Sequence, residues 1–63
     1  MTIVKGQRVA RTRTGIQHIA DKVLVMSVDA LCGQTLTWPQ AHELAGQPCP
    51  DCDRVARALA EGK

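Results

Sequence analysis

The cysteines are the residues in this chain best suited to chemistry. Cys49 and Cys52 are separated by two residues, in Cys49-Pro50-Asp51-Cys52, and the sequence after them reads as a helix. Two thiols at this spacing at a helix start typically supply half of a tetrahedral zinc site. Cys32 offers a third thiol, and either His18 or His42 can supply the fourth ligand. The pattern predicts one structural Zn²⁺ held by three cysteines and one histidine.

The choice of histidine follows from the elements expected around it. His18 lies on a predicted strand that pairs beside the strand leading to Cys32, and thirteen residues lie between His18 and Cys32. His42 lies within a short predicted helix, with six residues between it and Cys49. Because a hairpin places ligands from its two arms side by side, we predict His18, Cys32, Cys49 and Cys52 as the ligands, with His42 as the alternative to His18.

The size of the chain also favours a metal over three cysteines that are merely buried as apolar residues. At 63 residues, the protein forms one domain, and a domain of this size buries so little surface that its hydrophobic stabilisation is marginal. It has no Phe or Tyr, and Trp38 is its only aromatic residue, so the core must come from aliphatic side chains. A structural zinc contributes on the order of 10–16 kcal/mol in small fingers, which is enough to decide whether such a chain folds.

Three features argue against catalysis. The zinc-deaminase signature needs a glutamate two residues after its histidine, but Leu44 follows His42 at that position. No βαβ pattern surrounds the Cys-x-x-Cys pair, as a thioredoxin-like protein would require. Three cysteines and a histidine also leave no open coordination position, which a catalytic zinc needs. We therefore expect that the protein is not an enzyme.

The basic residues are concentrated at the start of the chain. Residues 1–22 carry five basic residues against one acidic residue, whereas residues 23–63 carry three against five. We interpret residues 1–14 as a basic arm or edge strand and residues 15–63 as the zinc-binding domain. Spaced cations can neutralise phosphates, which predicts contact with DNA. The candidate nucleic-acid-binding residues are Lys5, Arg8, Arg11 and Arg13.

Trp38 supports a different function. Tryptophan is favoured at the centres of protein interfaces, so an exposed Trp38 would indicate a protein-interaction module. The alternative is that Trp38 covers a poor core, which we consider the better prediction. An exposed Trp38 with acids among the arginines would favour an adaptor or inhibitor, and a buried Trp38 with a continuous basic face would favour DNA.

The remaining patterns predict a small α+β fold. We expect strands at Thr2–Val4, Ile16–Ile19 and Lys22–Val28, with a turn at Asp21–Lys22. The apolar run within 23–28 suggests burial on both faces. Helical signals at 39–45 predict a short helix, with an irregular loop as the alternative. A last helix follows at 50–61, where Cys52, Val55, Ala56 and Leu59 share one face that should pack on the hairpin. The result is a zinc-stapled hairpin or three-stranded antiparallel sheet with a C-terminal helix.

The layout His18…Cys32-Gly33…Cys49-Pro50-Asp51-Cys52, with a terminal helix, resembles small zinc-finger proteins of actinobacteria and their phages and plasmids. The match covers residues 18–59. The resemblance implies a zinc-ribbon-like β-hairpin plus helix and an early histidine, here His18, among the ligands. It implies no particular activity.

Cellular setting and partners follow from general features. The longest apolar stretch, Val23-Leu24-Val25-Met26, is too short to span a bilayer, and we see no signal-peptide pattern. Three cysteines are an odd number for a disulfide scaffold, so we expect a cytoplasmic protein that does not engage membranes. We predict a regulatory protein that contacts DNA or the transcription machinery, with a protein-binding adaptor as the alternative. Self-association into a homodimer would hide apolar surface.

Overall fold

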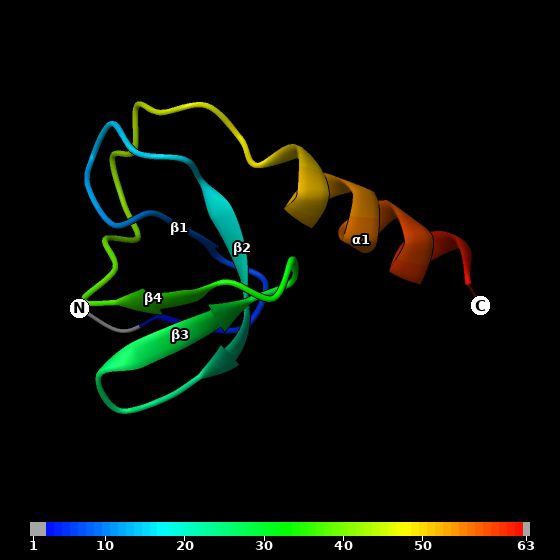
Figure 1. Ribbon diagram of the computed structural model, residues 1–63, viewed down its shortest axis with the longest axis horizontal. Helices are drawn as coiled ribbons and strands as arrows, with labels where there is room; N and C mark the ends of the chain where they lie inside the picture. Colours follow the sequence, from blue (N-terminus) through cyan, green and yellow to red (C-terminus); the bar gives the residue numbers. More distant parts are fainter. Residues whose placement is uncertain (1–2, 63) are drawn as a thin grey trace.

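The computed structural model describes residues 3–62, in which four strands precede one helix (Figure 1). The elements are β1 Arg8–Val9, β2 His18–Val23, β3 Ser27–Ala30, β4 Thr35–Thr37 and α1 Pro50–Glu61. The strands form a curled antiparallel sheet in the order β1-β2-β3-β4, and α1 extends away from one end of it. The predicted α+β fold with a C-terminal helix is confirmed, with four strands where two or three were expected.

The predicted hairpin is formed by β2 and β3, but its turn lies later in the chain. β2 continues through Asp21 and Lys22, so the turn predicted there is wrong. A register shift between Ala20 and Lys22 absorbs an extra residue as a bulge without ending the strand. The chain reverses after Val23, and the Leu24 N–H donates to the Ser27 carbonyl oxygen at 2.9 Å.

The apolar run within 23–28 is not buried on both faces, and that prediction is wrong. Val25 is 100% exposed, and Val23, Leu24 and Met26 are also exposed. Only the end of the run enters β3, where Val28 is buried between β2 and β4. The residues of this run are of strand-forming, apolar types. Most of them lie at the turn between β2 and β3, where no second layer of residues 3–62 covers them.

Residues 39–45 form an irregular connection, so the predicted short helix is wrong. The Gln40 N–H donates to the Ala10 carbonyl oxygen at 2.7 Å, and the Ala10 N–H donates back at 2.9 Å. The Ala45 N–H donates to the Arg13 carbonyl oxygen at 2.7 Å, and Glu43 has a left-handed φ of 53°. The backbone thus pairs with residues 10–13 instead of with itself, and these tertiary bonds override helix propensity.

The N-terminal part of the chain contributes both an edge strand and core residues. β1 lies within the predicted basic arm of residues 1–14, and it pairs with β2 through Arg8 opposite Ile19. Val9 and Ala10 are fully buried. Ile3 and Val4 lie outside any strand, which contradicts the strand predicted there, and Thr2 lies outside the described residues.

The core is built from small side chains. Its buried members are Val9, Ala20, Val28, Ala30, Leu36, Ala41, Cys49 and Cys52. The helix α1 begins and ends as predicted, with Pro50 in its first turn and Gly62 after its end. However, Cys52 is its only fully buried residue, and Leu59 is 63% exposed. The predicted packing of the whole apolar stripe on the hairpin is therefore wrong, because α1 projects beyond the sheet (Figure 1).

Gly46 lies where two loops meet, and its replacement tests this packing. A Cβ at this position would overlap the carbonyl oxygen of Gly15. We expect Gly46→Ala to lower the free energy of unfolding by about 1–3 kcal/mol, the usual range for overpacking. Chemical denaturation of the metal-loaded protein measures this. Ala45→Ser is the matched control, because Ala45 is exposed and its backbone hydrogen bond is retained. Equal stability of both variants would contradict the prediction.

Candidate metal centre

The structure brings together the four predicted ligands, His18, Cys32, Cys49 and Cys52. Their ligand atoms all lie within 4.8 Å of one another, so the cluster can hold one metal ion. Cys49 and Cys52 are buried, and His18 and Cys32 are half-buried. These residues come from the start of β2, the turn after β3 and the start of α1.

Backbone hydrogen bonds next to His18 place the helix start beside β2. The Cys49 N–H donates to the Gln17 carbonyl oxygen at 2.8 Å, and the Gln17 N–H donates to the Gln47 carbonyl oxygen at 2.8 Å. The Gln17 side chain also donates to the Gly46 carbonyl oxygen at 2.7 Å. Gln17 therefore fixes the segment before Cys49 against the segment before His18.

A tight turn after β3 positions Cys32. The Ala30 N–H donates to the Gln34 carbonyl oxygen at 2.7 Å, and the Gly33 N–H donates to the Ala30 carbonyl oxygen at 3.0 Å. Gly33 has a φ of 94°, a left-handed conformation that glycine adopts without strain. The turn lets the Gln34 N–H donate to the Cys32 sulfur. A backbone amide thus reaches the Cys32 sulfur.

The first turn of α1 forms the second part of the cluster. Cys49 is the residue before the helix, and Pro50 supplies a first-turn position that needs no N–H donor. The backbone N–H groups of Asp51 and Cys52 donate to the Cys49 sulfur. Since these free N–H groups carry the positive end of the helix dipole, they stabilise a thiolate there.

The histidine presents its Nδ1 atom to the thiols. Nδ1 of His18 lies 3.4 Å from Sγ of Cys32 and 3.5 Å from Sγ of Cys52. His42, the alternative ligand, is exposed and is not part of the cluster. The β-bridge between Gln17 and Pro48 explains why His18 joins the cluster, because it brings the start of α1 to β2. His42 lies in the connection between β4 and α1 and is not brought to this contact.

Two thiols of the cluster have shifted pKa values. Burial raises the pKa of the Cys32 thiol to about 11, and the neighbouring thiols add to this effect. For Cys49, burial also acts to raise the pKa, but hydrogen bonds from the Cys52 and Asp51 N–H groups outweigh it and leave the pKa below its ordinary value. The Cys49 thiol therefore ionises more readily than the Cys32 thiol.

The candidate DNA-binding residues are exposed, and two of them have partners. Arg8 lies 3.8 Å from the Asp53 carboxylate, and Nε of Arg13 donates to the Glu43 carbonyl oxygen at 3.1 Å. Lys5 and Arg11 are exposed and form no ion pair within residues 3–62. In residues 23–63, five acidic residues lie among three basic residues.

Trp38 does not cover the core. It is 67% exposed and follows β4 with a left-handed φ of 56°. The prediction that it acts as a lid is wrong, because Leu36 fills the position facing the core and the chain turns outward directly after Thr37.

Other residues important for the cluster were not recognised in the sequence. Gln17 and the contact between Gly15 and Gly46 hold the helix start in place. The only available signal was the presence of two glycines in loops, and it does not reveal which loops meet.

Comparison with family models, curated proteins and solved structures finds no match for this chain. Within the part of the chain that the structure describes, no helix is long and apolar enough to cross a membrane. The geometry of the cluster and of the surface therefore carries the functional argument.

Metal binding should release protons and so depend on pH. Because the pKa of Cys32 is raised to about 11, this thiol is protonated at neutral pH in the metal-free protein, whereas a metal binds the thiolate. We expect the apparent metal affinity to rise by about tenfold per pH unit for each proton released. Competition with a chelator of known affinity at several pH values measures this. His42→Ala should show the same slope, and an affinity independent of pH would contradict the prediction.

Proposed function

We propose that the cluster holds one structural Zn²⁺. Three thiols and an imidazole are a known structural zinc set. A tetrahedral zinc with ordinary bond lengths separates a sulfur from a nitrogen by about 3.5 Å. The separations from Nδ1 of His18 to the sulfurs of Cys32 and Cys52, 3.4 and 3.5 Å, fit this value. The convergence of these atoms is the observation that carries the proposal.

The zinc would join parts of the chain that the small core holds weakly. All four ligands of the proposed zinc come from the protein, which is typical of a structural zinc site and not of a catalytic one. The largest fully buried side chains are Val9, Val28 and Cys52, which bury little apolar area. His18, Cys32 and the Cys49–Cys52 pair tie β2, the turn after β3 and α1 to one point. With four protein ligands and no open position, we propose no enzymatic activity.

Ligand variants test the assignment. We expect the wild type and His42→Ala to bind one zinc per chain and to remain folded. His18→Ala should bind more weakly by several orders of magnitude or lose the fold, because structural zinc energy is folding energy in domains of this size. Metal analysis after gel filtration, with circular dichroism before and after chelation, measures both. Zinc retained in His18→Ala and lost in His42→Ala would overturn the assignment.

We infer that the folded module acts as a protein-interaction adaptor or inhibitor. The exposure of Trp38 supports this, because tryptophan is enriched at interface hot spots. The charge arrangement supports it too. Arg8 is paired with Asp53, and Arg54 is paired with Asp51 at 2.6 Å, so acids interrupt the arginines of the surface.

DNA contact is the second candidate function. Lys5 and Arg11 are exposed cations without ion pairs in residues 3–62, and residues 1–22 carry a net charge of +4. Such residues give affinity for duplex DNA that falls steeply with salt. Contact with DNA or the transcription machinery therefore stays a prediction, and it is tested with the adaptor proposal.

One pair of experiments separates the two candidates. A photo-crosslinking amino acid replaces Trp38 in one variant and the exposed Ala60 in a control variant. When each variant is expressed in cells and irradiated, we expect a discrete crosslinked protein adduct from the variant at position 38 and none from the variant at position 60. In parallel, binding to duplex DNA is measured across a salt series for the wild type and Lys5→Gln/Arg11→Gln. Salt-sensitive DNA binding that the double substitution weakens, without a protein adduct at position 38, would replace the adaptor proposal with the DNA function.

A further inference from the structure

The three cysteines of the cluster differ in their exposure to solvent. Cys49 is 6% exposed and Cys52 is fully buried, whereas Cys32 is half-buried. Cys32 also lies in a turn whose next two residues, Gly33 and Gln34, are exposed. A Cβ built at Gly33 would meet no described atom within 4 Å, so the space beside this turn is open. A small solute therefore reaches the Cys32 sulfur more easily than the other two sulfurs.

Exposure decides which of these sulfurs reacts first with an oxidant. The susceptibility of a cysteine to peroxides follows its thiolate character and its exposure. Because a bound zinc would hold all three cysteines as thiolates, thiolate character does not distinguish them in the metal-loaded protein. Cys32, the most exposed of the three, is therefore the first site of attack.

Both cysteines at the start of α1 are close enough to react with an oxidised Cys32. The ligand atoms of the cluster all lie within 4.8 Å of one another. Since the S–S bond of a disulfide is about 2 Å long, either sulfur needs to approach Cys32 by at most about 3 Å. No large movement of the backbone is required to bring a second thiol to the attacked sulfur.

We propose that hydrogen peroxide converts the cluster into a disulfide between Cys32 and one of the two cysteines at the start of α1, Cys49 or Cys52. This response rests on the proposed zinc site, two of whose ligands it consumes. The disulfide would replace the metal as the link between the turn after β3 and α1.

The reaction takes two steps on the protein's own sulfurs. The Cys32 thiolate attacks a peroxide oxygen, so an S–O bond forms, the O–O bond breaks, and the leaving hydroxide takes a proton from solvent to become water. The second thiolate then attacks the Cys32 sulfur, so the S–S bond forms, the S–O bond breaks, and another hydroxide leaves as water. The two sulfurs lose two electrons in total, which reduce one hydrogen peroxide to two waters. His18 and one cysteine remain as ligands, which is too few to retain zinc.

The proposed disulfide keeps α1 joined to the hairpin after the metal has left. Cys52 is the only fully buried residue of α1, so few apolar contacts hold the helix in place. A disulfide from Cys32 crosses from the turn after β3 to the helix start, and such a cross-link restricts the unfolded chain. A bond between Cys49 and Cys52 would close only a local loop. The oxidised, metal-free protein should therefore be more stable than the reduced, metal-free protein.

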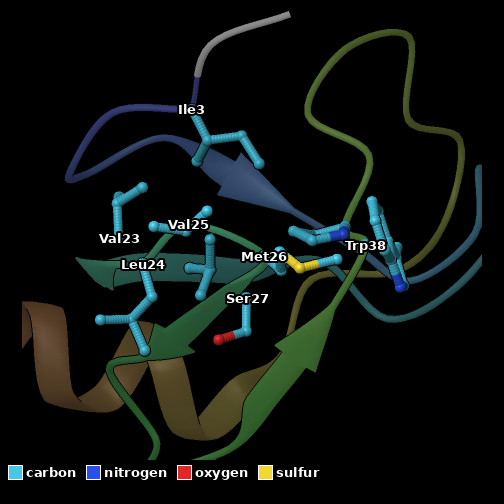
Figure 2. Close-up of a pocket in the computed structure, with 9 residues that line it drawn as sticks. Ile3, Val23, Leu24, Val25, Met26, Ser27 and Trp38 are labelled. Carbon is cyan, nitrogen blue, oxygen red and sulfur yellow. The ribbon is translucent and has the colours of Figure 1, made fainter.

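Met26 is another sulfur that peroxide can reach. It is 54% exposed, and Figure 2 shows its side chain beside that of Trp38 at the β2–β3 turn. No residue of the cluster lines the groove at this turn. Oxidation of Met26 adds an oxygen, whereas the disulfide removes two hydrogens, so mass spectrometry separates the two reactions. Met26→Leu is the matched control, and it should release zinc at the wild-type rate.

Zinc release and disulfide mapping test the proposal on the zinc-loaded wild type. Hydrogen peroxide is added, and free zinc is followed with a chromogenic chelator. A protease that cleaves after glutamate then cuts at Glu43, between Cys32 and the other two cysteines. We expect one zinc released per chain and two fragments joined until a reductant is added. Fragments that separate without reductant, as a Cys49–Cys52 disulfide or sulfonic products would give, refute the proposal.

Cys32→His tests where the oxidant attacks. Two cysteines and two histidines are also a structural zinc set, so this variant keeps four ligands without the most exposed thiolate. We expect peroxide to release its zinc at least about tenfold more slowly than that of the wild type. In the wild type, a 1,3-dione reagent that traps sulfenic acids should label Cys32 first, and this labelling decides the point if the variant does not bind zinc. Release at the wild-type rate, or first labelling of Cys49 or Cys52, would overturn the assignment of Cys32.

Chemical denaturation compares the two metal-free states. Protein oxidised with peroxide should unfold at a higher denaturant concentration than protein treated with chelator and reductant, with circular dichroism as the readout. Equal midpoints would show that the disulfide does not replace the metal cross-link. A wild type without zinc before peroxide is added would refute the zinc site and this response together. Bound zinc that peroxide does not convert into a disulfide would refute the response alone.

Discussion

The structure depends on the convergence of four side chains, His18, Cys32, Cys49 and Cys52, at one point. Their ligand atoms lie within 4.8 Å although thirteen and sixteen residues separate the first three in the chain. Bringing such distant positions together has an entropic cost that grows with loop length. The core offers valines, alanines and one leucine to offset it, and α1 has a single fully buried residue, which is itself a cysteine of the cluster. A metal bound by all four side chains would therefore supply the cross-link that apolar packing does not.

The small core also explains the unusual distribution of large side chains. Trp38, Val25, Met26 and Leu59 lie outside, while alanines occupy several inner positions. In a domain stabilised by burial alone, this arrangement would forgo the hydrophobic stabilisation of its largest apolar side chains. If the proposed metal were the main cross-link, these residues would be available for the proposed interaction surface. The same physical fact supports both the metal proposal and the adaptor proposal.

The parts of the fold that follow from local chemistry were predictable from the sequence. Pro50, the first-turn aspartates and Gly62 define α1, and the two-residue cysteine spacing at its start indicates the metal cluster. The parts that depend on distant backbone pairing were not. Residues 39–45 have helical propensity, but their N–H and carbonyl groups pair with Ala10 and Arg13. The bulge near Lys22, which moves the turn, and the outward course at Trp38 also leave no local signal.

The β2–β3 hairpin connects the two functional regions. His18 begins β2 and Cys32 follows β3, so the cluster lies at the open end of the hairpin, and the exposed apolar side chains of the β2–β3 turn lie at its closed end. Five residue steps along β2 span about 17 Å. Because β2 and β3 are paired on both sides of the bulge between Ala20 and Lys22, restraining their open ends would limit how far the strands can separate at the turn. A metal bound at the cluster would thus stabilise the turn without contacting it. The proposed metal and the exposed turn would thus be mechanically coupled, since a hairpin of this length is only marginally stable on its own.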